Sequence, residues 1–132
     1  VTYFDDSFST TPETTIAAIR AFSEPIILIA GGSEKGSDFT ELGKVISEAK
    51  NIKAVILIGL MAERIEAAIT NKDIKLIKGA KNMGEIMELA RSVAKSGDVV
   101  VLSPAAASFD MFKNYKDRGN QFKEAIMRLS RV

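Results

Sequence analysis

Several polar residues follow predicted strands and could bind a small molecule. They are Asp6, Ser7, Thr10, Lys35, Ser103 and Ser108. A lysine and several hydroxyls can hold a polar or anionic ligand through charge-assisted and neutral hydrogen bonds. These residue types do not make a complete catalytic centre. The sequence therefore indicates a binding site for a small molecule, and we expect no catalytic residue in the chain.

Composition excludes several classes of chemistry. The 132 residues include no cysteine and no histidine, so disulfides, thiolate nucleophiles, Cys/His zinc sites and Ser-His-Asp triads are ruled out. We expect no metal ligands. The formal net charge is +1 and no run of five like charges occurs, which argues against nucleic acid or a membrane surface as a partner. No apolar stretch reaches the roughly 18 residues of a membrane span.

Short apolar runs alternate with segments of helical spacing. The runs PIILIA, IKAVILI and VVVL are typical of strands buried on both faces. Proline after Thr11 and the caps Asp38 and Asp110 indicate helix starts. The strands are expected at Thr2–Asp5, Pro25–Ala30, Ile52–Ile58, Ile74–Ile77 and Val99–Leu102, each followed by a helix.

This alternation predicts one α/β domain over residues 1–132. Parallel neighbouring strands need helical crossovers, so we expect a Rossmann-like, doubly wound, mostly parallel sheet with helices on both faces. Loops after the carboxyl ends of such strands lie along one edge, where ligands bind. The polar residues are therefore expected to meet at this edge.

Each candidate also has a purely structural interpretation. Gly31-Gly32 could simply permit a tight turn, and the segment GGSEKGS is neither a dinucleotide fingerprint nor a phosphate loop. Lys35 could be a solvated loop lysine. Met83 and Met87 are interpreted as helix core, and the charges of Arg91–Lys95 and Arg118–Arg131 as solvated faces.

Four segments together resemble one family. They are Asp5–Pro12 with the alanines that follow, Gly31–Phe39, Gly97–Asp110 and Phe112–Phe122. In this order they are similar to the C-terminal domain of the Mur ligases. The segment LSPAAASFD with the later RGNQF resembles the ligases that add D-glutamate to UDP-N-acetylmuramoyl-L-alanine in peptidoglycan biosynthesis.

The resemblance implies a three-domain, ATP-dependent enzyme in which this chain binds the amino acid and closes the active site. The N-terminal domain would hold the UDP sugar, and the central domain would hold ATP and magnesium. We expect both domains to be missing here, because the resemblance covers only the C-terminal domain. We expect the chain alone to be inactive, because the phosphate loop and the magnesium ligands are missing, and the first residue Val1 suggests a fragment of a longer chain. The absence of a signal peptide favours the cytoplasm.

The resemblance also implies roles for five residues. Thr10, Lys35 and Ser108 would bind the carboxylates of D-glutamate. Tyr115 would line the same pocket, where many relatives have phenylalanine. Asp6 would approach the nucleotide when the domain swings shut.

One departure from the family's pattern bears on specificity. Many relatives have a lysine where this chain has Phe8. Lys35 is then the only cation expected near the amino acid, which leaves the amino-acid selectivity open.

Two alternatives have a different function. The chain could be the equivalent domain of another Mur ligase or of a folylpolyglutamate synthase, although the SPAAASFD segment favours the D-glutamate enzyme. It could also be a free-standing small-molecule-binding or response-regulator-like module. A regulator needs a phosphoacceptor aspartate at the end of a central strand, and Ile29–Gly31 and Ile58-Gly59 have none.

Overall fold

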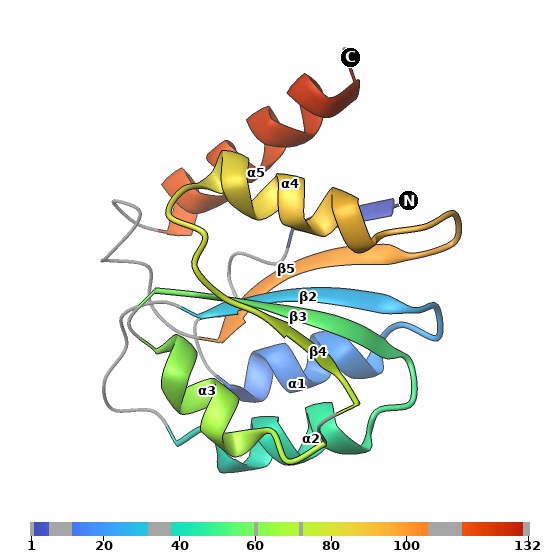
Figure 1. Ribbon diagram of the computed structural model, residues 1–132, viewed down its shortest axis with the longest axis vertical. Helices are drawn as coiled ribbons and strands as arrows, with labels where there is room; N and C mark the ends of the chain where they lie inside the picture. Colours follow the sequence, from blue (N-terminus) through green and yellow to red (C-terminus); the bar gives the residue numbers. More distant parts are fainter. Residues whose placement is uncertain are drawn as a thin grey trace.

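The predicted alternation of strands and helices is confirmed. The computed structural model describes residues 2–5, 12–31, 38–59, 61–71, 73–105 and 115–130. The elements in chain order are β1 (Thr2–Asp5), α1 (Pro12–Arg20), β2 (Ile26–Gly31), α2 (Thr40–Glu48), β3 (Ile52–Ile58), α3 (Ala62–Ala68), β4 (Lys75–Ile77), α4 (Met83–Val93), β5 (Val99–Ala105) and α5 (Tyr115–Ser130) (Figure 1).

The strands form one sheet in the order β1-β5-β2-β3-β4. Each pair of neighbours is parallel, so the predicted parallel sheet is confirmed. The last strand in sequence lies between the first two, and Val100 of β5 is opposite Tyr3 of β1 and Ile27 of β2.

Helices cover both faces of the sheet (Figure 1). Helices α1, α2 and α3 pack on one face, and α4 and α5 on the other. Side chains of a strand alternate between the faces. In β2, Ile26 and Leu28 join the first core while Ile27 and Ile29 join the second, which is why the PIILIA run is apolar throughout. The doubly wound fold is thereby confirmed.

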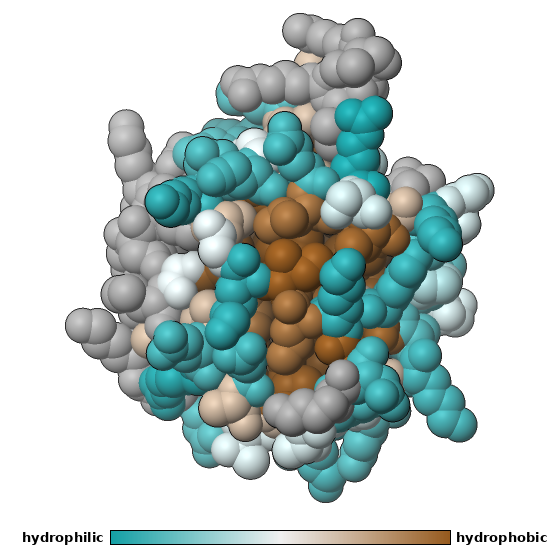
Figure 2. Space-filling view, in the orientation of Figure 1, coloured by the Kyte–Doolittle hydropathy of each residue, from teal (hydrophilic) through white to brown (hydrophobic). Residues whose placement is uncertain are grey.

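Helix α4 supplies much of the second core. Met83 and Met87 are 3% and 1% exposed, as the helical spacing predicted, and Phe122 of α5 is fully buried beside them. Figure 2 shows apolar surface between α4 and the helices beneath it, over the edge strand β4, whose Leu76 and Ile77 are half-buried. Among the described helices, none has the length and apolar character needed to cross a membrane.

Strand β5 is longer than its apolar run predicts. It continues from Leu102 to Ala105, so Ser103 lies in the sheet and not in the loop that follows. Ser103 is fully buried. Its carbonyl oxygen accepts a hydrogen bond from Thr15 Oγ1 at 3.1 Å, and its hydroxyl donates to the same atom at 3.2 Å. Ser103 therefore connects β5 to α1 and was wrongly assigned to the ligand edge.

Candidate functional site

Three of the predicted polar loops leave the sheet from neighbouring strands. Asp5, the last residue of β1, is opposite Leu102 of β5. Gly31, the last residue of β2, is opposite Ala105, the last residue of β5. The chain after β1, β2 and β5 therefore departs from one continuous stretch of the sheet edge, as the sequence predicts.

The helices that follow these three strands lie on opposite faces of the sheet. Helices α1 and α2, which follow β1 and β2, pack on one face, whereas α5, which follows β5, packs on the other. Strand β5 therefore lies between two strands whose following helices are on the face opposite to α5. In open α/β sheets, ligands bind outside the carboxyl ends of the strands at such a switch point.

Four of the five predicted site residues lie outside the described residues: Asp6, Thr10, Lys35 and Ser108. Tyr115 is the first described residue of α5, at the same edge, but its side chain is not described. Their roles stay predictions. Phe8, Ser7 and Asp110 also lie outside the described part.

Gly31 is a structural requirement of this edge. Its φ of 132° lies in the range that L side chains rarely adopt. A Cβ added there would overlap the carbonyl oxygen of Ile58 on the neighbouring strand. Gly31 is therefore required by its backbone conformation and by its close packing against β3, whereas the predicted tight turn at Gly31-Gly32 includes residues outside the described part.

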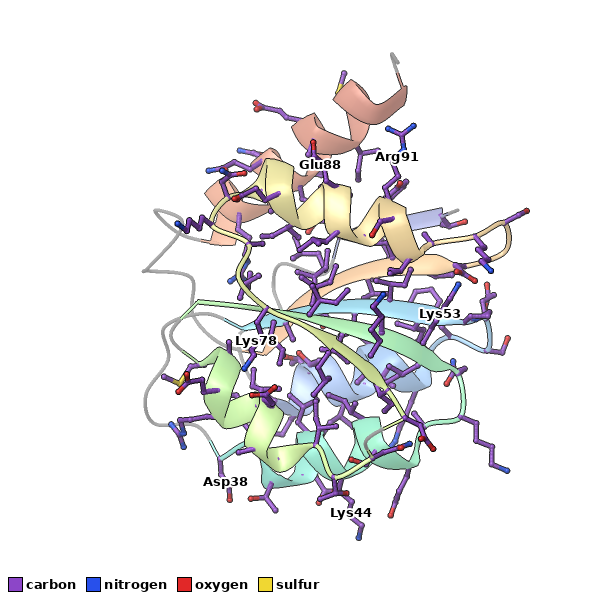
Figure 3. The ribbon with its side chains drawn as sticks, viewed as in Figure 1. Asp38, Lys44, Lys53, Lys78, Glu88 and Arg91 are labelled. Atoms are coloured by element: carbon purple, nitrogen blue, oxygen red, sulfur yellow. The ribbon has the colours of Figure 1, made fainter. Side chains whose placement is uncertain are left out.

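Asp38 lies one residue before the N-cap position of α2, which is Phe39, and it binds the start of the helix, close to the predicted cap. Its Oδ1 accepts a hydrogen bond of 2.9 Å from the backbone N–H of Thr40, the first residue of α2. Hydrogen bonds from the side chain and backbone of Thr40 hold the pKa of Asp38 below its ordinary value. The carboxylate points away from the sheet (Figure 3) and satisfies a helix terminus, so it has no part in the candidate site.

The burial of Arg118 is a feature that the sequence analysis missed. Its side chain is 0% exposed, so the interpretation of this residue as part of a solvated face is wrong. The spacing contains a signal for this burial, because Arg118 precedes the buried Phe122 by four residues and so lies on the same face of α5. Arginine side chains are rarely buried completely, so residue type alone predicts exposure at this position.

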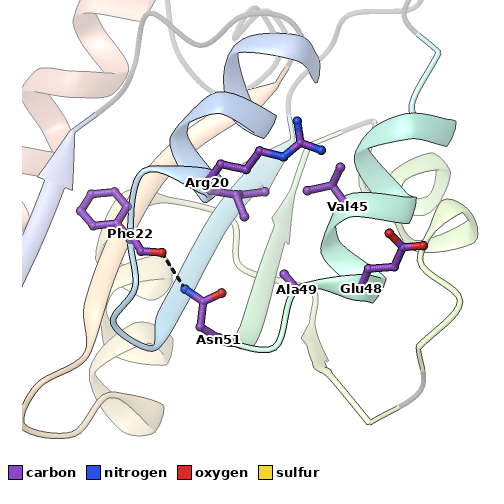
Figure 4. Close-up of a pocket in the computed structure, with 7 residues that line it drawn as sticks. Arg20, Phe22, Val45, Glu48, Ala49 and Asn51 are labelled. Atoms are coloured by element: carbon purple, nitrogen blue, oxygen red, sulfur yellow. Dashed lines mark hydrogen bonds between the residues drawn. The ribbon is translucent and has the colours of Figure 1, made fainter.

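Hollows occur at both edges of the sheet. One of about 550 Å³ lies between the start of α4 and the middle of α5, where Gln121 and Glu124 line it. Another, of about 290 Å³, lies where the strands begin (Figure 4). There Arg20 and Glu48 face each other across apolar side chains, and Asn51 Nδ2 donates to the carbonyl of Phe22 at 3.0 Å.

No group of three or more acidic, histidine or cysteine residues that could hold a metal ion occurs in the described ranges.

Comparison with known proteins identifies relatives along nearly the whole chain. A family model described as "Mur ligase, glutamate ligase domain" matches residues 1–106. The chain is 41% identical, over 96% of its length, to the UDP-N-acetylmuramoylalanine–D-glutamate ligase of Clostridium perfringens. It is 43% identical, over 98% of its length, to the ligase of the same name from Clostridioides difficile.

The chain spans 28% of the length of each of these two relatives. Among solved structures, it resembles a domain of a Haemophilus ducreyi protein described as a UDP-N-acetylmuramate:L-alanyl-gamma-D-glutamyl-meso-diaminopimelate ligase. The TM-score is 0.62 at 16% identity, covering 96% of this chain and 89% of the other. At that identity, the likeness concerns the fold alone.

Proposed function

Because the chain belongs to the Mur ligase family, as its glutamate ligase domain, we propose that it is the amino-acid-binding domain of a ligase that adds D-glutamate to UDP-N-acetylmuramoyl-L-alanine. The observation that carries the proposal is the 41–43% identity, over nearly the whole chain, to ligases of that name. The order of the strands supports it, because the residues matched to the family's amino-acid site follow β1, β2 and β5, which are neighbours in the sheet.

In this function the chain binds and orients the incoming amino acid. Lys35 pairs with a carboxylate of D-glutamate, and Thr10 and Ser108 donate hydrogen bonds. Tyr115 lines the pocket, and Asp6 approaches the nucleotide. When the domain closes, it excludes water from the activated substrate, which would otherwise hydrolyse.

The rest of the protein supplies the other half of the reaction. ATP provides the phosphoryl group that activates the carboxylate of UDP-N-acetylmuramoyl-L-alanine. From the resemblance to three-domain Mur ligases, we assign the nucleotide and the metal mainly to a central domain and the UDP sugar to an N-terminal domain. Both nucleotide substrates are cytoplasmic compounds, and we place the protein in the cytoplasm.

The test is a ligation assay with the full-length protein. Purified protein, ATP, magnesium and UDP-N-acetylmuramoyl-L-alanine should release phosphate when D-glutamate is added. L-Lysine, meso-diaminopimelate and L-glutamate should give little product. If the protein instead extends a folate with L-glutamate, or joins another amino acid to a longer muramoyl peptide, the assignment is wrong and a related ligase is correct.

A further inference from the structure

The smaller hollow, of about 290 Å³, lies between the ends of α1 and α2 (Figure 4). Phe22, which precedes β2, and Asn51, which directly precedes β3, both line it. It is therefore at the edge where the strands begin, opposite to the edge of the predicted amino-acid site. We call it the Arg20/Glu48 pocket after its two charged residues, and all of its lining residues belong to the described part of the chain.

The walls of this pocket are apolar and held in place by the fold. Ile19 of α1 and Val45 of α2 are 4% and 9% exposed and belong to the first core, and Phe22 packs against that core. Asn51 Nδ2 donates hydrogen bonds to the carbonyl oxygens of Phe22 at 3.0 Å and of Glu24 at 2.9 Å. These bonds join the segment after α1 to the turn after α2. The pocket is thus already formed, as most ligand pockets are.

Two opposite charges border the apolar walls. Arg20 is the last residue of α1 and Glu48 is the last residue of α2, and both are exposed. Figure 4 shows Val45 between the two charged groups. Within the described part of the chain, no ion pair or hydrogen bond joins the guanidinium of Arg20 or the carboxylate of Glu48 to another group. Both charges are therefore available to a ligand.

The position of Glu48 is unfavourable for its own helix. The last carbonyl groups of a helix carry partial negative charge, which favours a basic residue nearby and disfavours an acidic one. Helix α2 has no basic residue in its last turn, and Glu48 adds a negative charge there, whereas Arg20 at the end of α1 follows the rule. Residues that break a local rule are expected at functional sites. The end of α2 thus presents a negative wall, and the end of α1 a positive one.

We propose that the Arg20/Glu48 pocket binds a small zwitterion with an apolar side chain, of the size of one amino acid. The ligand's ammonium group binds Glu48 and the end of α2, and its carboxylate accepts hydrogen bonds from Arg20. Its apolar side chain packs on Val45 and Phe22. The volume is close to the lower end of ligand pockets, about 300 Å³, which limits the ligand to one small molecule. This site is separate from the amino-acid site and does not depend on the proposed function.

Ligand-observed NMR titrations of the full-length protein test the site. The probe is L-leucine, and excess D-glutamate is present to occupy the predicted amino-acid site. Isocaproate keeps the carboxylate and the apolar chain, and isoamylamine keeps the ammonium group and the apolar chain. Each should bind about two- to fivefold more weakly than leucine, because each loses one of two exposed charge contacts. Glycine should bind at least about tenfold more weakly, because it has no apolar side chain to bury.

Two charge variants should give opposite patterns. Arg20→Gln should raise the Kd of leucine and isocaproate about two- to fivefold and leave that of isoamylamine unchanged. Glu48→Gln should raise the Kd of leucine and isoamylamine by a similar factor and leave that of isocaproate unchanged. Ala49→Leu keeps both charges but places a larger side chain in the lining, so it should weaken the binding of all three compounds.

Matched controls remove the same charges from other helix ends. Arg91→Gln removes an exposed arginine from the last turn of α4, and Glu41→Gln removes an exposed acid from the first turn of α2. Both variants should leave every Kd unchanged, because neither residue lines the pocket.

The remaining outcomes overturn the proposal. Leucine binding that none of the pocket variants alters would place the ligand elsewhere. Equal affinity for leucine, isocaproate and isoamylamine would mean that only apolar surface is recognised, and no binding of leucine up to its solubility would mean that the pocket has no such ligand. Thermal unfolding checks each variant, and if Arg20→Gln does not fold, the comparison of isocaproate with isoamylamine in Glu48→Gln decides. A protein that binds leucine here but does not ligate D-glutamate would refute the proposed function alone.

Discussion

At the scale of single residues, one largely buried carboxylate stabilises the fold. At the edge where the strands begin, Asp98 is 5% exposed. Its Oδ2 accepts hydrogen bonds from Lys53 Nζ at 2.7 Å and from the backbone N–H of Lys95 at 2.8 Å (Lys53 is labelled in Figure 3). This carboxylate has satisfied partners and connects the turn before β5 to β3. Its role is therefore structural.

We expect Asp98→Asn to destabilise the chain by about 1–3 kcal/mol at pH 7, because a hydrogen-bonded, largely buried charge is lost. The measurement is the free energy of unfolding from chemical denaturation. Glu66→Gln is the matched control, since Glu66 Oε1 is also 2.7 Å from a lysine Nζ, that of Lys78, but in an exposed pair. The control should lose much less stability, and equal losses would contradict the prediction.

The effect of Asp98 should also depend on pH. The hydrogen bond from Lys53, followed by that from Lys95, holds the pKa of Asp98 below its ordinary value, against the opposing effect of burial. A lowered folded-state pKa gives stability that is complete above the unfolded-state pKa of about 3.9 and is lost as the pH falls through the folded-state pKa. The difference between the two proteins should therefore shrink below about pH 4, and a constant difference would exclude this cause.

For the amino-acid site, the sharpest residue-scale prediction concerns Lys35. Lys35→Ala in the full-length protein should lower kcat/KM for D-glutamate by roughly ten- to a hundredfold, because a charge-assisted contact contributes about 1.5–3 kcal/mol. The KM for ATP should change much less. Should the KM for ATP rise while that for D-glutamate stays constant, Lys35 belongs to the nucleotide site.

Residue types alone predicted the structural role of some of these side chains and failed for others. Asp38 was predicted as a cap because aspartate before a helical segment can accept a backbone N–H, and it does so. Ser103 and Arg118 were misplaced, because polar and charged residues are usually exposed. Their burial results from tertiary contacts. Ser103 finds a hydrogen-bonding partner in Thr15, 88 residues away, and such pairs are not visible in a single sequence.

At the scale of elements, apolar runs were sufficient to predict the strands. The run IKAVILI coincides with β3, and the run PIILIA with β2 apart from one residue at each end. The order of the strands was not predicted, because β5 inserts between β1 and β2 through long-range pairing. The end of β5 was missed because Ser103-Pro104 reads as a turn in sequence, whereas the neighbouring β2 continues the pairing to Ala105.

Helix packing gives a prediction at this scale. Gly43 of α2 faces α3 so closely that an added Cβ would overlap the backbone carbonyl of Ala68. Helix propensity alone predicts that Gly43→Ala stabilises the chain by about 1 kcal/mol. We expect the opposite, a loss of about 1–3 kcal/mol, because backbone atoms must move apart. The measurement is the free energy of unfolding.

Gly84→Ala in α4 is the control for Gly43→Ala. An added Cβ there meets one side-chain atom, Asn82 Oδ1, at 3.2 Å. The stability should change by less than about 1 kcal/mol. A stabilised Gly43→Ala protein would show that α2 and α3 separate at little cost, and the close packing would then not be a requirement of the fold.

At the scale of the whole molecule, the described elements cover their own sheet, whereas the proposed reaction needs groups from outside the chain. Helices cover both faces of the sheet, and the central strand β2 is buried along its whole length. The relatives it matches are longer, since the chain spans 28% of their length. The core thus depends on residues within the chain, whereas we assign the nucleotide and the UDP sugar to residues outside it.

The last prediction concerns the chain expressed without the rest of the protein. The 132-residue chain, expressed alone, should fold and unfold in one cooperative transition, because both apolar faces of its sheet are covered from within. It should neither hydrolyse ATP nor ligate D-glutamate when UDP-N-acetylmuramoyl-L-alanine is added. Thermal unfolding followed by circular dichroism tests the first part, and a phosphate-release assay tests the second. A chain that is unfolded alone would mean that contacts with the other domains complete its core. Turnover of ATP would mean that the chain itself holds the nucleotide, and the assignment of the nucleotide to a central domain would be wrong.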